Sequence, residues 1–270
     1  MAGGEQGQVE QLADWLRWAK RAVAFTGAGI STECGIPDFR SPGGIWTRMQ
    51  PIDFRDYVTR ADMRREAWRR KREMQPLFAA ARPGAVHRLL ADLIARGRLK
   101  AIVTQNIDNL HQTSGVPEER IIELHGNGSY AHCLSCGVRY EQAWIDARMA
   151  PDFSVPDCEA CGGLIKTATI SFGQPMPAEA MRRATLEAET SDLFVVLGSS
   201  LVVYPAAGLP ITAKRHGARL VIVNREPTEL DDLADLVINA ELGAVAQSLA
   251  GHLAPPGVAS GGRQDAADGC

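Results

Sequence analysis

Residues 22–31, Ala-Val-Ala-Phe-Thr-Gly-Ala-Gly-Ile-Ser, determine the fold class that we expect for this 270-residue chain. A short apolar run ends in two glycines one residue apart, and Ser31 and Thr32 then supply residue types that cap helices. Such glycines let backbone N–H groups approach a phosphate at a helix N-terminus, because no Cβ lies in the way. The dinucleotide fingerprint has a third glycine where Thr32 stands, so this stretch alone is a weak signal. Residues 35–40, Gly-Ile-Pro-Asp-Phe-Arg, strengthen it, because a mere connection rarely combines a rigid proline, a carboxylate, an aromatic ring and a guanidinium.

The composition is that of an ordinary globular protein, with 45% hydrophobic and 23% charged residues. A net charge of −3 gives no overall attraction to nucleic acid or to an anionic membrane, so we expect neither as a partner. The apolar runs, such as 193–197, are too short to cross a bilayer, and the first residues lack a signal-peptide pattern. We therefore expect a cytoplasmic protein.

Four of the six cysteines form two Cys-x-x-Cys pairs separated by 21 residues: Cys133, Cys136, Cys158 and Cys161. In a reducing compartment this spacing predicts one tetrahedral zinc site. Four thiolates leave no open coordination position, so the predicted zinc is structural. For Cys34 and Cys270 we expect a structural or incidental role.

Apolar periodicity predicts strands and helices in alternation. We expect strands at 22–26, 99–104, 121–124, 193–197, 220–223 and 236–238, and helices at 8–20, 84–97 and 242–253. Residues 45–82 are expected to form short helices packed over the glycine loop. This order predicts an α/β fold, a Rossmann-type doubly wound parallel sheet built from residues 8–126 and 169–253. Residues 127–168 form an inserted zinc-ribbon domain in this interpretation, and residues 254–270 a disordered tail.

Four predicted strands end in glycine or polar residues, at 27–31, 105–108, 198–200 and 224–226. In a parallel sheet these ends lie along one edge, which is where open α/β sheets bind ligands and which is long enough for a dinucleotide. Asn106 and Asp108 alternate, so both side chains can face one cleft, although a turn that requires Asn and Asp is the alternative. Residues 224–226 could instead cap a helix.

His125 follows a predicted strand and precedes the first cysteine of the zinc motif by eight residues. A histidine titrates near neutral pH, so one at a cleft between two domains is suited to general base catalysis. The alternatives are a hydrogen-bonded core histidine or a zinc ligand, and four cysteines already complete a tetrahedral site. We interpret His111 and His132 as structural. Residues 60–72 carry seven basic and two acidic residues, which favours a solvated helix face over a nucleic-acid patch.

Taken together, these motifs resemble the sirtuins. The resemblance rests on residues 27–40, on Thr104 to Asp108, on His125-Gly126, on the two cysteine pairs, on Phe172-Gly173, on Gly198 to Leu201 and on Asn224, in that order. It covers about residues 10–250 and implies an NAD-dependent protein-lysine deacylase with a Rossmann-type domain and an inserted zinc domain. In that family NAD is consumed, and the products are free lysine, nicotinamide and an O-acyl-ADP-ribose.

The resemblance also implies roles for individual residues. His125 takes the role of the base that deprotonates a ribose hydroxyl, and Asn106 resembles the residue that orders the ribose. The implied NAD-binding residues are Gly27, Ala28, Gly29, Ser31, Ile36, Asp38, Phe39, Arg40, Gln105, Asn106, Ile107, Asp108, Gly198, Ser199, Ser200, Asn224, Arg225, Glu226 and Leu242. An acyl-lysine protein segment would bind as an extended strand between two segments that comprise Ile170, Ser171, Phe172 and Gly173, and Leu201, Val202 and Val203.

The chain departs from the family pattern in places. Lys166-Thr167 stands where Arg-Pro is frequent, and Gln174 replaces a glutamate, which weakens any preference for basic residues beside the substrate lysine. Trp68 and Lys71 align with the Tyr-x-x-Arg pair of the subgroup that removes succinyl groups, so acidic acyl groups are not favoured. We expect acetyl-lysine as substrate. The alternatives are a mono-ADP-ribosyltransferase, a non-catalytic NAD-sensing or nucleic-acid-binding zinc module, and a Rossmann dehydrogenase.

Overall fold

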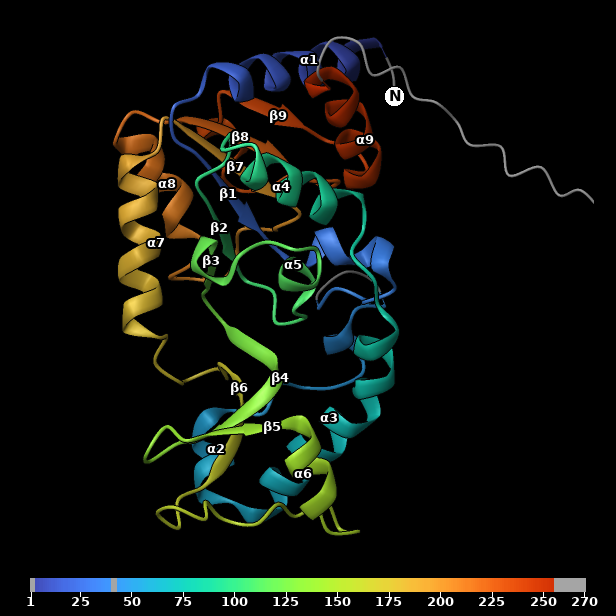
Figure 1. Cartoon of the computed structure of the whole chain (residues 1–270), viewed down its shortest axis with the longest axis vertical. Coiled ribbons are helices and arrows are strands. Elements are labelled where there is room, and N and C mark those ends of the chain that lie inside the picture. Colours follow the sequence, from blue (N-terminus) through green and yellow to red (C-terminus); the bar gives the residue numbers. More distant parts are fainter. Residues whose placement is uncertain (1–2, 40–42, 255–270) are drawn as a thin grey trace, which may run out of the picture.

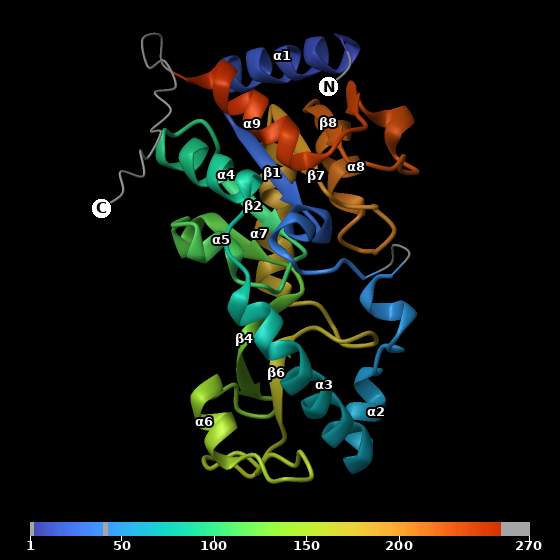
Figure 2. The same cartoon turned by 90° about the vertical axis from the view of Figure 1, so that its right-hand side faces the viewer.

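The computed structural model describes residues 3–39 and 43–254. Arg40, Cys270 and the predicted tail beyond Ala254 lie outside this range. Figures 1 and 2 show an elongated molecule with a parallel sheet and its helices at one end and a smaller module at the other.

Six parallel strands form the main sheet: β1 Ala22–Thr26, β2 Ala101–Thr104, β3 Ile121–Glu123, β7 Leu193–Leu197, β8 Arg219–Val223 and β9 Leu236–Ile238. Their order is β3-β2-β1-β7-β8-β9, with every neighbouring pair parallel. The strand order therefore reverses beside β1, at the start of the glycine loop. This confirms the Rossmann-type fold, in which such a reversal opens a crevice at the carboxyl ends of the strands.

Two layers of helices cover the sheet (Figure 1). The helices α1 Gly3–Trp18, α4 Ala85–Ala95 and α9 Leu242–Leu253 share one apolar cluster with Ala24, Ile102 and Val195. The helices α7 Ala178–Thr190 and α8 Gly208–Arg215 share the opposite cluster with Val23, Phe25 and Phe194. Successive strand residues point to opposite faces, so an unbroken apolar strand such as β1 supplies both layers.

The inserted module lies between β3 and β7 in the chain. Its strands β4 Gly126–Cys133, β5 Arg139–Glu141 and β6 Ile165–Thr169 form an antiparallel sheet in the order β5-β4-β6, beside helix α6 Gln142–Arg148. Strand β4 runs from the end of the main sheet into the module, and its neighbour β6 runs back toward the main sheet. These two paired strands therefore connect the module to the main sheet (Figure 2).

Residues 45–82 form η2 Ile45–Thr47, α2 Phe54–Thr59 and the 20-residue helix α3 Ala61–Ala80. The prediction of short helices packed over the glycine loop was only partly right. Near the carboxyl end of α3, Phe78 packs with Ile36 of that loop, whereas Trp68 is buried among residues of the inserted module, including Tyr140 and Ile145. The remaining short elements are η1 Ala28–Cys34, α5 Leu110–Thr113, η3 Glu118–Arg120 and η4 Asp231–Leu233.

Three of the six basic residues of α3 form ion pairs with acidic side chains. Arg69 and Arg70 both pair with Glu66, and Arg72 pairs with Asp146 of α6. This network agrees with a solvated helix face and gives no support to a nucleic-acid patch. No helix in the described part of the chain is long and apolar enough to span a membrane.

Candidate functional site

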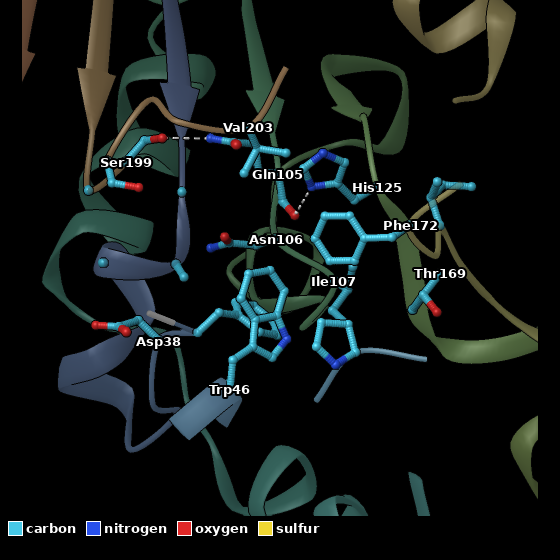
Figure 3. A pocket seen from close by; sticks show the side chains of 18 of the residues that line it. Asp38, Trp46, Gln105, Asn106, Ile107, His125, Thr169, Phe172, Ser199 and Val203 are labelled. Carbon is cyan, nitrogen blue, oxygen red and sulfur yellow. Dashed lines mark hydrogen bonds between the residues drawn. The ribbon is translucent and has the colours of Figure 1, made fainter. Parts of the chain in front are cut away.

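A cavity of about 480 Å³ lies at the carboxyl edge of the main sheet, facing the inserted module. Residues from all four predicted strand ends line it, together with the segment that follows β6. Figure 3 shows Gln105, Asn106, His125, Phe172 and Ser199 around this space. The lining includes Gly27, Ala28, Gly29, Asp38, Phe39, Gln105, Asn106, Ile107, His125, Ile170, Ser171, Phe172, Gly173, Gly198, Ser199, Ser200, Val203, Asn224, Arg225, Glu226 and Leu242.

The glycine loop packs against the loop that follows β7. The amides of Gly27 and Gly29 donate to the carbonyl oxygens of Leu197 and Gly198. A Cβ on Gly27 would lie 2.6 Å from the Gly198 oxygen, and a Cβ on Gly29 would lie 2.8 Å from the Cα of Gly198. Only glycines allow two backbone loops to approach this closely, so the glycines shape the floor of the cavity.

The expected helix cap at Ser31 was wrong. Residues 28–34 form a 3₁₀-helix whose N-cap is Gly27, so Ser31 and Thr32 lie inside it. Ser31 is buried, and its hydroxyl donates to the Asp108 carboxylate at 2.7 Å and accepts from the Asn106 amide at 3.3 Å. Ser31 therefore links the glycine loop to the loop after β2.

Asn106 is held in place by a chain of hydrogen bonds among buried polar side chains. Its backbone N–H donates to Thr104, whose hydroxyl accepts from Thr26 at 2.8 Å, and Thr26 lies 3.0 Å from His111 Nε2. Burial lowers the pKa of His111 to about 3, so this ring is neutral and structural, as its position after β2 suggested. Asn106 is 7% exposed and its orientation is fixed.

His125 lies at the junction of the main sheet and the inserted module. Its Nδ1 is 3.1 Å from the carbonyl oxygen of Gln105, which can only accept a hydrogen bond, so Nδ1 carries the proton (Figure 3). The next residue, Gly126, has a φ of +70°, and a Cβ there would lie 1.9 Å from the Ala168 oxygen. This turn brings His125 against β6, whose following residue Ile170 donates to the His125 carbonyl at 2.9 Å.

Three aromatic rings border the cavity beside His125. Trp46 packs between Phe39, at a centroid distance of 5.3 Å, and Phe172, at 5.2 Å. The loop after the glycine motif thereby contacts the segment after β6. Figure 3 shows Trp46, Asn106 and Phe172 around the same space.

Several predicted site residues do not line the cavity. The Asp108 carboxylate accepts from Ser31 and from the Leu110 amide, so its side chain organises the turn before α5. Ile36 and Leu201 are buried in apolar clusters, and Val202 is 45% exposed beside the cavity residue Val203. Arg40 lies outside the described residues. Residues 224–226 line the cavity and cap no helix.

The structure adds cavity residues that the sequence analysis did not assign: Thr32, Trp46, Pro51, Ile52, Thr169, Gln174, Met176, Tyr204, Pro205 and Glu241. Half of them lie directly beside predicted residues, as Glu241 does beside Leu242. Trp46 carried no comparable signal, because its role depends on how the loop after residue 43 crosses toward Phe172.

The four predicted metal-binding cysteines meet at one end of β4. The Sγ atoms of Cys133, Cys136, Cys158 and Cys161 all lie within 4.8 Å of one another. The Tyr140 hydroxyl donates to Cys158 Sγ at 3.1 Å, which lowers the pKa of this thiol to about 6. Four thiolates at this spacing fit a tetrahedral zinc ion, and a donor set without an open position gives it a structural role.

Comparison with known proteins agrees with this architecture. The model of the Sir2 family matches residues 27–205, which is more than half of the chain. The chain belongs to the Sir2 family. It is 59% identical over 235 residues to NAD-dependent protein deacetylase 1 of Bradyrhizobium diazoefficiens, covering 87% of this chain and 92% of that protein. It is 57% identical to an NAD-dependent protein deacetylase of Rhodopseudomonas palustris, covering 87% and 93%. A solved Sir2 complex with a p53 peptide and NAD⁺ superposes with a TM-score of 0.80 at 37% identity, covering 89% of this chain and 96% of that one.

Proposed function

We infer that this Sir2 protein is an NAD-dependent protein-lysine deacylase and that acetyl is the acyl group it removes. The observation that carries the proposal is the position of His125, which faces the cavity with Nδ1 bound to the Gln105 carbonyl. Among the relatives, those from Bradyrhizobium and Rhodopseudomonas are named NAD-dependent deacetylases.

His125 acts as the general base in this proposal. Because the Gln105 carbonyl holds the proton on Nδ1, Nε2 keeps a lone pair and can take a proton from a ribose hydroxyl. The carbonyl also accepts the Nδ1–H bond when the ring becomes cationic, which stabilises the protonated base.

The cavity fits a dinucleotide. It reaches from His125 to Asn224, Arg225 and Glu226, and its walls carry polar groups from four strand ends. NAD supplies a ribose carbon that is activated by a leaving nicotinamide. Asn106 and Ser199 would bind ribose and phosphate groups, and Phe39 and Ile107 would enclose the nicotinamide.

The substrate would bind as an extended strand between residues 170–174 and 202–204. Phe172 is 46% exposed and Tyr204 is 62% exposed, so apolar side chains border this part of the cavity. A peptide that adds a strand here would place its acyl-lysine beside His125.

The proposal also covers the domain boundaries, the zinc site and the cellular location. Residues 8–126 and 169–253 form the NAD-binding domain, and residues 127–168 form the zinc domain. Cys133, Cys136, Cys158 and Cys161 would hold the zinc that stabilises the inserted module. Four cysteines arranged for metal rather than for disulfides agree with a cytoplasmic location.

Nicotinamide release from NAD tests the function, measured with and without an acetyl-lysine peptide for the wild type and for His125→Ala. We expect release by the wild type only with peptide, and a loss of about 10²–10⁴-fold in complete turnover in the variant. Label transfer from NAD to protein without acyl-lysine would instead support ADP-ribosyl transfer. Equal turnover by both proteins would refute the role of His125.

A further inference from the structure

Two buried histidine rings lie side by side beneath the site, His87 from α4 and His111 from α5. Their centroids are 5.1 Å apart, and the side chains are 0% and 2% exposed. Among the described residues, their Nε2 and Nδ1 atoms, respectively, are the only buried side-chain nitrogens or oxygens without a hydrogen-bond partner. An unpaired buried donor or acceptor is costly, so two of them on neighbouring rings need an explanation.

The unpaired nitrogen of His87 is a donor. The amide of Gly84, just before α4, donates to His87 Nδ1 at 3.3 Å. Because an amide N–H can only donate, Nδ1 keeps its lone pair and the proton of the neutral ring is on Nε2. Burial lowers the pKa of His87 to about 4, so the ring is neutral near pH 7.

The unpaired nitrogen of His111 is an acceptor. Its Nε2 lies 3.0 Å from the hydroxyl oxygen of Thr26, which donates its one proton to Thr104 at 2.8 Å. The Thr26 oxygen therefore accepts from Nε2–H of His111. This leaves the lone pair of the neutral ring on Nδ1.

The two unpaired atoms are thus complementary. A single hydrogen bond between them would satisfy both, and the spacing of the rings is compatible with an N–H···N bond. The carboxylate that acts electrostatically on His87 is that of Asp108, and its two oxygens already accept from Ser31 and from the Leu110 amide. The neighbouring histidine is therefore the acceptor that suits His87.

We propose that His87 donates Nε2–H to Nδ1 of His111, and that this pair makes both histidines positioning residues for Asn106. The chain of hydrogen bonds then runs from the start of α4 through the two rings and Thr26 to Thr104, which also accepts from the Asn106 amide. Its bonds from α4 to Thr104 all donate in one direction, and such bonds strengthen one another. The proposal rests on the deacylase function and on the binding of ribose by Asn106.

Nitrogen NMR of the ¹⁵N-labelled wild type tests the pair and requires neither a variant nor turnover. We expect both rings to be neutral with the proton on Nε2 at pH 7, and a scalar coupling across the hydrogen bond between His87 Nε2 and His111 Nδ1. A proton on Nδ1 of His111, or the absence of this coupling, would overturn the proposal.

Turnover of an acetyl-lysine peptide tests the positioning role. We expect kcat to fall about tenfold in His87→Leu, which cannot donate, with little change in the KM for NAD. His87→Gln keeps an N–H donor and should retain most of kcat. Leu90→Ala is the matched control, because it removes a buried side chain of the same helix that takes no part in the chain. It should lower the melting temperature and leave kcat unchanged below it.

An equal fall in kcat in Leu90→Ala, or an unchanged kcat in His87→Leu, would overturn the positioning role. A wild type that turns over no acyl-lysine peptide would instead refute the deacylase function. In that case the coupling between the two rings would still be measurable.

Discussion

The main sheet and the inserted module are stabilised by different means. The sheet is covered on both faces by large apolar clusters to which five helices contribute. The module has one cluster of seven buried residues, of which Trp68 comes from α3 and two, Cys133 and Cys158, belong to the zinc site. The sheet can therefore hold its strand ends in place through hydrophobic burial, whereas the module depends on a metal for part of its core. The site lies where the two meet.

Loss of the zinc should have the largest effect on stability, and it should affect the module but not the main sheet. In Cys158→Ser we expect zinc content to fall and β4, β5 and β6 to lose protection from hydrogen exchange, while the main sheet keeps its protection. A structural zinc contributes about 10–16 kcal/mol in small zinc domains, which is comparable to the whole stability of a domain. Activity should be lost, because β4 and β6 flank His125.

Cys34→Ser serves as the matched control, since Cys34 lies near the glycine loop and outside the zinc site. It should retain one zinc per chain. If β4 to β6 stayed protected in Cys158→Ser, the module would be stable without its metal and the contrast with the sheet would fail.

Low pH should destabilise the sheet region, because two of its buried histidines become protonated on unfolding. His87 and His111 are almost fully buried with ring centroids 5.1 Å apart, and burial lowers their pKa to about 4 and about 3. An unfolded chain takes up these protons below about pH 6.5, whereas the folded chain resists them. Their contribution to stability is thus complete above pH 6.5 and is lost as the pH falls toward 4.

The expected loss is about 1.4 kcal/mol per pH unit for each histidine within this window. Urea unfolding at pH 7 and pH 5 measures it, with the signal taken from the main sheet. His111→Gln should flatten this pH dependence. An equal slope in wild type and variant would mean that His111 becomes protonated without unfolding.

The sequence predicted the sheet better than the module, for a physical reason. Strands such as 193–197 are apolar on both faces and end in glycine, so periodicity and punctuation agree, and their bounds were confirmed. Helices α7 and α8 were not predicted individually. Much of α7's buried face is formed by small residues, Ala184 and Ala188, which give little apolar contrast. The placement of α3 depends on Trp68 finding Tyr140 and Ile145 of the module, a contact between distant residues that no local pattern contains.

The site residues also fall into two groups, those that local sequence patterns located and those that depend on tertiary contacts. His125, Asn106 and the glycines were located because strand ends mark the sheet edge. The side chain of Asp108 turned to Ser31, because a turn before α5 needs an acceptor for the Leu110 amide. Alternation along the chain could not distinguish these two orientations. The position of Trp46 depends on tertiary contacts with Phe39 and Phe172, and this residue was not assigned to the site.

The junction between the sheet and the module, at the start of β4, offers a sharper test of the comparison. Asn127 is 3% exposed and donates to Glu123 at 2.7 Å and to Asn109 at 3.1 Å, while its oxygen accepts from Ser129. These bonds fix both sides of His125. In Asn127→Ala we expect kcat to fall about tenfold with little change in the KM for NAD, because an unpaired network costs about 1–3 kcal/mol. Ser129→Ala should have a smaller effect, since its backbone N–H still bonds to Asn127. A rise in the KM for NAD alone would show that the network supports the cofactor side instead.

The smallest effect should come from Glu33, which acts wholly within the sheet region. Its carboxylate accepts from the Ala85 amide at 2.8 Å at the start of α4, and it lies so close to Gly243 in the first turn of α9 that a Cβ there would be 2.2 Å away. One carboxylate thus meets the positive ends of two helices and attaches the glycine loop to both. Glu33→Ala should lower the free energy of unfolding by about 1 kcal/mol. Glu10→Ala, at an exposed position of α1, should not lower it. If metal content and the protection of β4 to β6 also fell in Glu33→Ala, the two regions would be coupled more tightly than their separate cores imply.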